Sequence, residues 1–154
     1  MEEGDDFAEL YAAVGPRLWR TIYVFTGGRP DMADDVVAEA FVRTLERGEG
    51  IRDRAAYAYR VAFRLATLEL RRPPTFADVP EESAAAVDED PHDLLAALRQ
   101  LSPKQRAAVY LRYQVDLPID EIAHLMATSP AAVRVHLMRG RRRLAELLPE
   151  VADV

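Results

Sequence analysis

Apolar side chains recur along this chain at intervals of three and four residues, which is the spacing of one face of an α-helix. No segment shows a convincing alternation of apolar and polar residues, the pattern of a half-buried β-strand. The pattern predicts three helices in the first half, over residues 7–25, 31–47 and 54–72, and four in the second, over 92–101, 102–114, 118–126 and 129–148. We therefore expect an all-α fold.

Prolines and capping residues indicate where these helices begin and end. Pro16 lies inside the first predicted helix and is expected to kink or break it. Asp31 is the expected N-cap of the second helix, and the Pro-Pro pair at 73–74 ends the third. Ser102 and Gln105 have the spacing of a capping box at the start of another helix.

Residues 73–91 have the composition of a linker. They contain four prolines, six acidic residues, no basic residue and few large apolar side chains. We therefore expect two small helical modules, residues 1–72 and 92–154, joined by an acidic, flexible, proline-containing linker.

The composition excludes several classes of protein. The chain has 154 residues and no cysteine, which rules out a disulfide scaffold and a zinc–thiolate site. No apolar run approaches the ~20 residues of a membrane-spanning helix, and the acidic N-terminus differs from a signal peptide. We expect a cytoplasmic protein with no membrane insertion.

The sequence shows no arrangement typical of an enzyme. His92, His124 and His136 are too scattered for a metal cluster. Neither a glycine-rich phosphate loop nor a nucleophile–base motif is present. We expect no catalytic residue, no metal and no cofactor.

The net charge of −6, from 20 basic and 26 acidic residues, is unevenly distributed. No acidic residue lies between Glu121 and Glu146, whereas five arginines do. The acidic average therefore hides a basic C-terminal helix, and it does not exclude nucleic acid as a partner.

Residues 118–144 have the outline of a helix-turn-helix: two helices, a turn of about three residues, and a basic second helix. Ser129 is the expected N-cap of that second helix, with Pro130 at its first position. Its inward face carries Val133, Leu137, Gly140, Leu144 and Leu148. An ordinary helical hairpin with a solvated basic end is the alternative, because arginine is favoured near a helix C-terminus without any ligand.

The outward side of this helix provides the candidate DNA contacts. Arginine side chains there can neutralise phosphates or bind guanine edges, and the free N–H groups of the helix start can bind a phosphate. The candidates are Ser129, Ala131, Arg134, Val135, Met138, Arg139 and Arg142.

The first module carries two further candidate surfaces. In the third helix, Arg60, Arg64 and Arg71 form a basic stripe beside Tyr57, suited to a phosphate backbone and unpaired bases, or else simply a solvated face. The second helix instead concentrates acidic residues, namely Asp31, Asp34, Asp35 and Glu39. They could bind a basic partner, although acidic residues in a first turn are also expected from the helix dipole alone.

In this order the parts resemble a bacterial RNA polymerase sigma factor of the sigma-70 family, extracytoplasmic-function (ECF) group, which retains only sigma regions 2 and 4. The resemblance covers nearly the whole chain. Residues 31–45 resemble the helix that docks on the clamp of the polymerase β′ subunit. Residues 54–72 resemble the helix that reads and melts the downstream (−10) promoter element, and residues 98–144 resemble region 4, which reads the upstream (−35) element.

The resemblance implies an alternative sigma factor that binds core RNA polymerase and directs promoter recognition, melting and transcription initiation. The implied partners are the core enzyme, through its β′ clamp and β subunit, promoter DNA, and in addition an anti-sigma factor where one exists. The implied upstream contacts are the outward residues of 129–142, the downstream contacts are Tyr57, Arg60, Arg64 and Arg71, and the clamp contacts are Asp34, Asp35 and Glu39.

The chain departs from the usual family pattern at Ala38, Tyr57, Arg64, Leu68 and Ala127. Glycine is common at the last of these, and a left-handed backbone there would cost alanine roughly 1 kcal/mol. Two other functions stay open: a helix-turn-helix regulator that acts as a dimer without polymerase, and a degenerate sigma relative that acts as an interaction protein.

Overall fold

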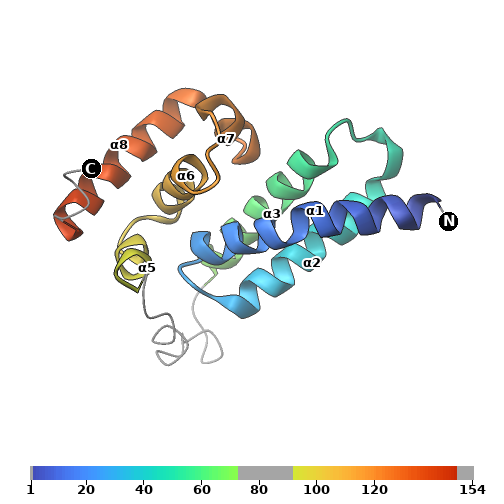
Figure 1. Ribbon diagram of the computed structural model, residues 1–154, viewed down its shortest axis with the longest axis horizontal. Helices are drawn as coiled ribbons and strands as arrows, with labels where there is room; N and C mark the ends of the chain where they lie inside the picture. The colour runs from blue at the N-terminus through green and yellow to red at the C-terminus, as the bar shows by residue number, and fades with distance from the viewer. Residues whose placement is uncertain (1, 73–91, 149–154) are drawn as a thin grey trace.

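The computed structural model in Figure 1 describes residues 2–72 and 92–148, which contain helices and no strand. The all-α prediction is therefore confirmed, while the predicted linker, residues 73–91, lies outside the described residues. No described helix has an apolar stretch long enough to span a membrane. The elements are α1 (Glu2–Phe25), α2 (Pro30–Arg47), the 3-10 helix η1 (Gly48–Gly50), α3 (Arg54–Arg71), α5 (His92–Arg99), α6 (Pro103–Tyr113), α7 (Ile119–Leu125) and α8 (Pro130–Leu147).

Helix α1 continues through Pro16, so the predicted break is wrong. The preceding residue is Gly15, and a glycine has no Cβ to clash with the proline ring. That small neighbour removes one of the steric conflicts that a proline causes inside a helix of 24 residues.

The N-cap predicted for α2 is also wrong. Arg29 holds that position in an extended conformation, Pro30 is the first helical residue, and Asp31 lies inside the first turn. A proline fixes its own φ near the helical value and drives the residue before it out of the helical region, so Pro30 sets the boundary.

The capping residues predicted for the second module are confirmed. Ser102 accepts a hydrogen bond from the N–H of Gln105, whose side chain accepts one in return from the N–H of Ser102. Ser129 accepts a hydrogen bond from the N–H of Ala132 at 3.1 Å and starts α8.

Each module has its own helix packing, and the two modules also pack against each other. In the first, α1, α2 and α3 all pack against one another, and in the second, α8 packs on α6 and α7. Between them, α6 packs against α1 and α7 against α3 (Figure 1). The sequence predicts two modules and a linker, but it does not predict this contact.

Candidate functional site

Helices α7 and α8 form the predicted helix-turn-helix. Its turn is closed by two main-chain hydrogen bonds, from Thr128 to the Ala123 carbonyl (2.9 Å) and from Ala127 to the His124 carbonyl (3.3 Å). This pair defines a Schellman motif, in which one residue adopts the left-handed conformation. That residue is Ala127, with φ of 54°. The turn therefore has a conformation that favours glycine, with an alanine at the left-handed position.

The inward face of α8 fixes the second helix against the rest of the module. Val133 and Leu137 are buried, as predicted. Gly140 is buried as well, and a Cβ at this position would come within 2.8 Å of the Val109 side chain on α6. The glycine therefore permits the close approach of α8 to α6 that holds α8 in place.

The α8 outer face consists of the predicted upstream residues: Ser129, Ala131, Arg134, Val135, Met138, Arg139 and Arg142. All of them are exposed, including the apolar Val135 and Met138, which are 38% and 45% exposed. None of the three arginines pairs with a carboxylate within residues 2–72 and 92–148. The face is thus cationic at three points, with apolar side chains between them.

The other arginines of the basic run have partners. Arg141 donates a hydrogen bond to the Tyr113 hydroxyl at 2.9 Å, and Arg143 pairs with Glu146 at 2.9 Å. Of the three consecutive arginines 141–143, the outer two therefore have side-chain partners, and only Arg142 belongs to the α8 outer face.

The predicted downstream residues lie on α3, which begins where the Asp53 carboxylate accepts a hydrogen bond from the N–H of Ala56. Arg60, Arg64 and Arg71 are exposed, and Tyr57 is half-buried. The neighbouring Tyr59 is instead a core residue, and its burial raises the pKa of its hydroxyl. Only one of the two tyrosines is therefore accessible to a base.

The α2 outer face consists of Asp34, Asp35, Ala38, Glu39, Val42 and Leu45, all of them exposed. Two of the predicted acidic residues already have partners: Asp34 accepts a hydrogen bond from the Trp19 indole N–H at 2.6 Å, and Glu39 pairs with Arg43 at 3.0 Å. The face also carries Val42 and Leu45, which are 45% and 51% exposed. The clamp-contact prediction therefore falls on a face with an apolar centre and acidic side chains around it.

Comparisons with known proteins identify the family to which this chain is similar. Residues 92–144 match the family described as Sigma-70, region 4. The chain is 33% identical over 163 residues to the RNA polymerase sigma-E factor of Streptomyces antibioticus, covering 96% of this chain and 88% of that protein. It is 34% identical to the sigma-E factor of Streptomyces avermitilis, covering 77% of this chain and 72% of that protein.

A further relative is the ECF RNA polymerase sigma factor BldN of Streptomyces coelicolor, 30% identical over 97% of this chain. The chain spans 63% of the length of that protein. The chain belongs to the ECF group of RNA polymerase sigma factors.

The fold of this sigma factor is also found in a solved structure. The sigma factor RpoE of Bartonella quintana, crystallised with the anti-sigma factor NepR, superposes with a TM-score of 0.71 at 20% identity, covering 94% of this chain and 97% of that one. The two-module, all-α arrangement is therefore that of the family.

Sequence reasoning missed the apolar part of the α2 outer face. The apolar residues Val37, Ala40, Phe41 and Leu45 follow the helical period, which predicts one inward stripe. The first three are buried, but Leu45 is exposed, and the inward position is instead Thr44, which donates its hydroxyl hydrogen bond to the Ala40 carbonyl at 2.7 Å. The spacing of Ala38, Val42 and Leu45 (i, i+4, i+7) gives a second apolar stripe on the same helix. That second stripe was the available signal.

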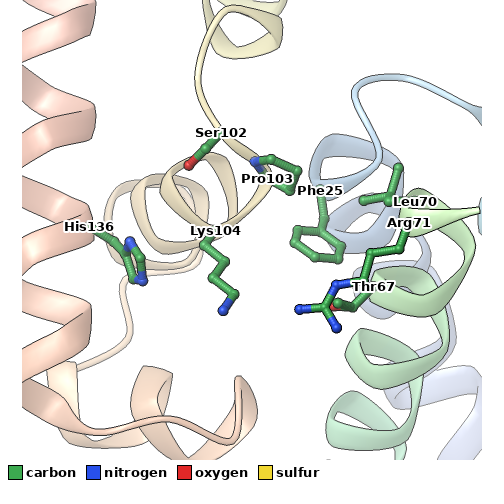
Figure 2. Close-up of a pocket in the computed structure, with 8 residues that line it drawn as sticks. All are labelled: Phe25, Thr67, Leu70, Arg71, Ser102, Pro103, Lys104 and His136. Atoms are coloured by element: carbon green, nitrogen blue, oxygen red, sulfur yellow. The ribbon is translucent and has the colours of Figure 1, made fainter.

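The contact between the modules also forms a pocket of about 280 Å³, which sequence reasoning did not foresee (Figure 2). Figure 2 shows Arg71 of α3 and Lys104 of α6 reaching into the space between the modules, with His136 of α8 on the far side. Burial lowers the pKa of His136, and the charges of Lys104 and Arg139 lower it further. The predicted downstream residue Arg71 thus lines one pocket together with a residue of α8.

Proposed function

We propose that this sigma factor binds core RNA polymerase through the α2 outer face and reads promoter DNA through α3 and α8. The α8 outer face binds the upstream (−35) promoter element. The downstream (−10) element is bound by Tyr57, Arg60, Arg64 and Arg71. The modules at 1–72 and 92–154, joined through 73–91, divide these tasks. The protein catalyses nothing itself, binds no cofactor, and acts in the cytoplasm, on the nucleoid when bound to polymerase.

The observation that carries the proposal is the α8 outer face. Three arginines without carboxylate partners among the described residues lie on a helix that is buried on its other side at Val133, Leu137 and Gly140. Arginine binds phosphates and the guanine edge, and the exposed Val135 and Met138 offer contacts to a thymine methyl group. A merely solvated helix end gains nothing from exposing these two apolar side chains.

The α2 outer face supports the polymerase part of the proposal. Protein interfaces commonly have an apolar centre with a polar rim, and the centre supplies most of the binding energy. Val42 and Leu45 supply the centre here, while Asp35 adds charge that suits a basic partner surface.

In vitro transcription with purified core enzyme tests the upstream site. Wild-type protein should direct initiation from a defined promoter set, and Arg139→Ala or Arg142→Ala should each weaken promoter binding about tenfold, the lower part of the range for one guanine contact. Arg143→Ala is the matched control, because Arg143 is an arginine of the same helix whose guanidinium is already paired with Glu146. Tight, specific binding to duplex DNA without core enzyme would instead support a regulator that acts without polymerase.

Core binding tests the α2 outer face separately. Leu45→Asp should reduce affinity for core polymerase at least tenfold, because it places a charge in the apolar centre. Leu68→Asp is the matched control, since Leu68 is 56% exposed but lies on α3. Core binding by the wild type without initiation at any promoter would support the interaction-protein alternative.

An anti-sigma factor is the remaining proposed partner, because the RpoE structure contains one. Co-purification of the tagged protein from its own cells, followed by inhibition of transcription in vitro with the isolated partner, tests this.

A further inference from the structure

Arg106 joins the two modules through main-chain carbonyl groups. Its side chain lies on α6 and is 7% exposed. The guanidinium donates hydrogen bonds from Nε (3.1 Å) and Nη2 (2.7 Å) to the carbonyl of Phe25, the last residue of α1. Nη1 donates to the carbonyl of Leu101 in its own module, at 3.0 Å.

A second arginine makes a contact of the same kind. Arg99, the last residue of α5, donates from Nε to the Gly27 carbonyl at 2.8 Å. Gly27 and Gly28 both have positive φ, and a Cβ on Gly28 would lie 2.5 Å from the Arg99 guanidinium. The glycine loop after α1 therefore has the shape that this arginine requires.

Together the two arginines cap the C-terminus of α1 from the other module. The last carbonyls of a helix have no partner inside it, and this end of the helix dipole attracts cations. A buried guanidinium with no described carboxylate beside it depends on these carbonyls. Burial, and then the charge of Arg99, lower the pKa of Arg106 to about 10, so it remains charged at neutral pH.

This closed arrangement does not fit simultaneous reading of two promoter elements. Elements centred near −35 and −10 lie about 25 base pairs apart, or about 85 Å along B-DNA. In the closed arrangement, Arg71 of α3 and His136 of α8 line one pocket. Residues 73–91 have a contour length of about 65 Å, which permits wide separation of the modules.

We infer that Arg106 and Arg99 form a latch that holds the free sigma factor closed, and that this latch must release before both promoter elements are engaged. The closed state is thus stabilised within the chain itself, by side chains of one module on the helix terminus of the other. The need for release rests on the proposed function, whereas the latch is a property of the free protein.

The test measures the distance between the modules in the full chain without polymerase. Because the chain has no cysteine, Leu68→Cys on α3 and Ala145→Cys on α8 place one label on each exposed position. Pulsed electron paramagnetic resonance or single-molecule Förster resonance energy transfer then measures the distance between the labels and gives the ratio of open to closed molecules. Arg106→Met should raise that ratio at least tenfold, since it removes every charge-assisted hydrogen bond from this side chain.

Arg112→Met is the matched control. Arg112 also lies on α6 and donates to a main-chain carbonyl, that of Leu117, but this bond stays within its own module. Its loss should leave the distance distribution unchanged. An unchanged distribution in Arg106→Met, or an equal opening in Arg112→Met, would overturn the latch.

Two further measurements keep the outcome decisive. If Arg106→Met loses its helical circular dichroism, Arg99→Met decides instead, because Arg99 is only half-buried; it should raise the ratio several-fold, and no change would overturn the latch. In vitro transcription is assayed in parallel. Opening in the arginine variants together with a wild type that initiates nowhere would sustain the latch and refute the proposed function.

Discussion

Ala127 occupies a backbone conformation that favours glycine. Its φ of 54° places it in the left-handed region, which costs a residue with a Cβ about 1 kcal/mol. Ala127→Gly should therefore stabilise the folded protein by up to about 1 kcal/mol, less the greater freedom that glycine gives the unfolded chain. Chemical denaturation measures this as a rise in the midpoint with an unchanged slope.

An alanine-to-glycine substitution at an ordinary helical position should instead lower the free energy of unfolding. Ala38 is exposed in the middle of α2, where Ala38→Gly should cost about 0.5–1 kcal/mol. A destabilisation of equal size at both positions would show that the turn gains nothing from glycine.

His136 should make stability depend on pH. Burial first, and then Lys104 and Arg139, lower its pKa in the folded protein, so the unfolded chain binds the proton more readily as the pH falls below about 6.5. Stability from this group is complete above that pH and declines below it. His136→Gln should make unfolding between about pH 7 and 5 less pH-dependent than in the wild type, as measured by denaturation at each pH.

A second variant separates the causes of this effect. Lys104→Met removes one of the cations that disfavour the charged imidazole, so it should also reduce the loss of stability in acid. A pH dependence that both variants leave intact would assign it to the carboxylates.

At the scale of elements, the packing of α8 on α6 depends on a glycine. A Cβ at Gly140 would lie 2.8 Å from Val109 and 3.4 Å from Leu101, so Gly140→Val overfills a packed contact. We expect a loss of about 1–3 kcal/mol in the free energy of unfolding. Ala145→Val places the same side chain at an exposed position of α8 and should cost well under 1 kcal/mol. Similar losses in the two variants would contradict a packing role for the glycine.

Interactions between residues close in sequence made most of the helices predictable, and the predictions that proved wrong also have local causes. The Ser102 and Ser129 caps follow from side-chain hydrogen bonds over three residues, which a sequence displays directly. The Asp31 cap was predicted wrongly because Pro30 moves the N-cap two residues earlier, to Arg29, and Leu45 was placed wrongly because α2 has two apolar stripes. Periodicity alone does not say which of two stripes faces the core.

At the scale of the whole molecule, the contact between modules was beyond sequence reasoning for a different reason. Arg106 and Phe25 are 81 positions apart, and the acceptor is a main-chain carbonyl, which every residue has. No residue type at Phe25 therefore indicates the bond. The candidate faces of α3 and α8 were predictable because helical spacing within one element defines them, whereas the pocket that Arg71 and His136 line together in the closed protein was not.

A final prediction concerns the salt dependence of DNA binding, which individual arginine contacts set even in a protein with a net charge of −6. A phosphate contact releases condensed counterions, so in the holoenzyme Arg142→Ala should reduce the slope of log affinity against log salt by about 0.9. Val135→Ala should leave the slope unchanged and alter preference at one base pair, because an apolar contact releases no ion. Promoter binding measured from about 50 to 200 mM salt gives both values. Arg143→Ala, the control whose guanidinium is paired with Glu146, should retain the wild-type slope. A full slope in Arg142→Ala would mean that this arginine makes no phosphate contact and contributes to recognition through a base edge alone.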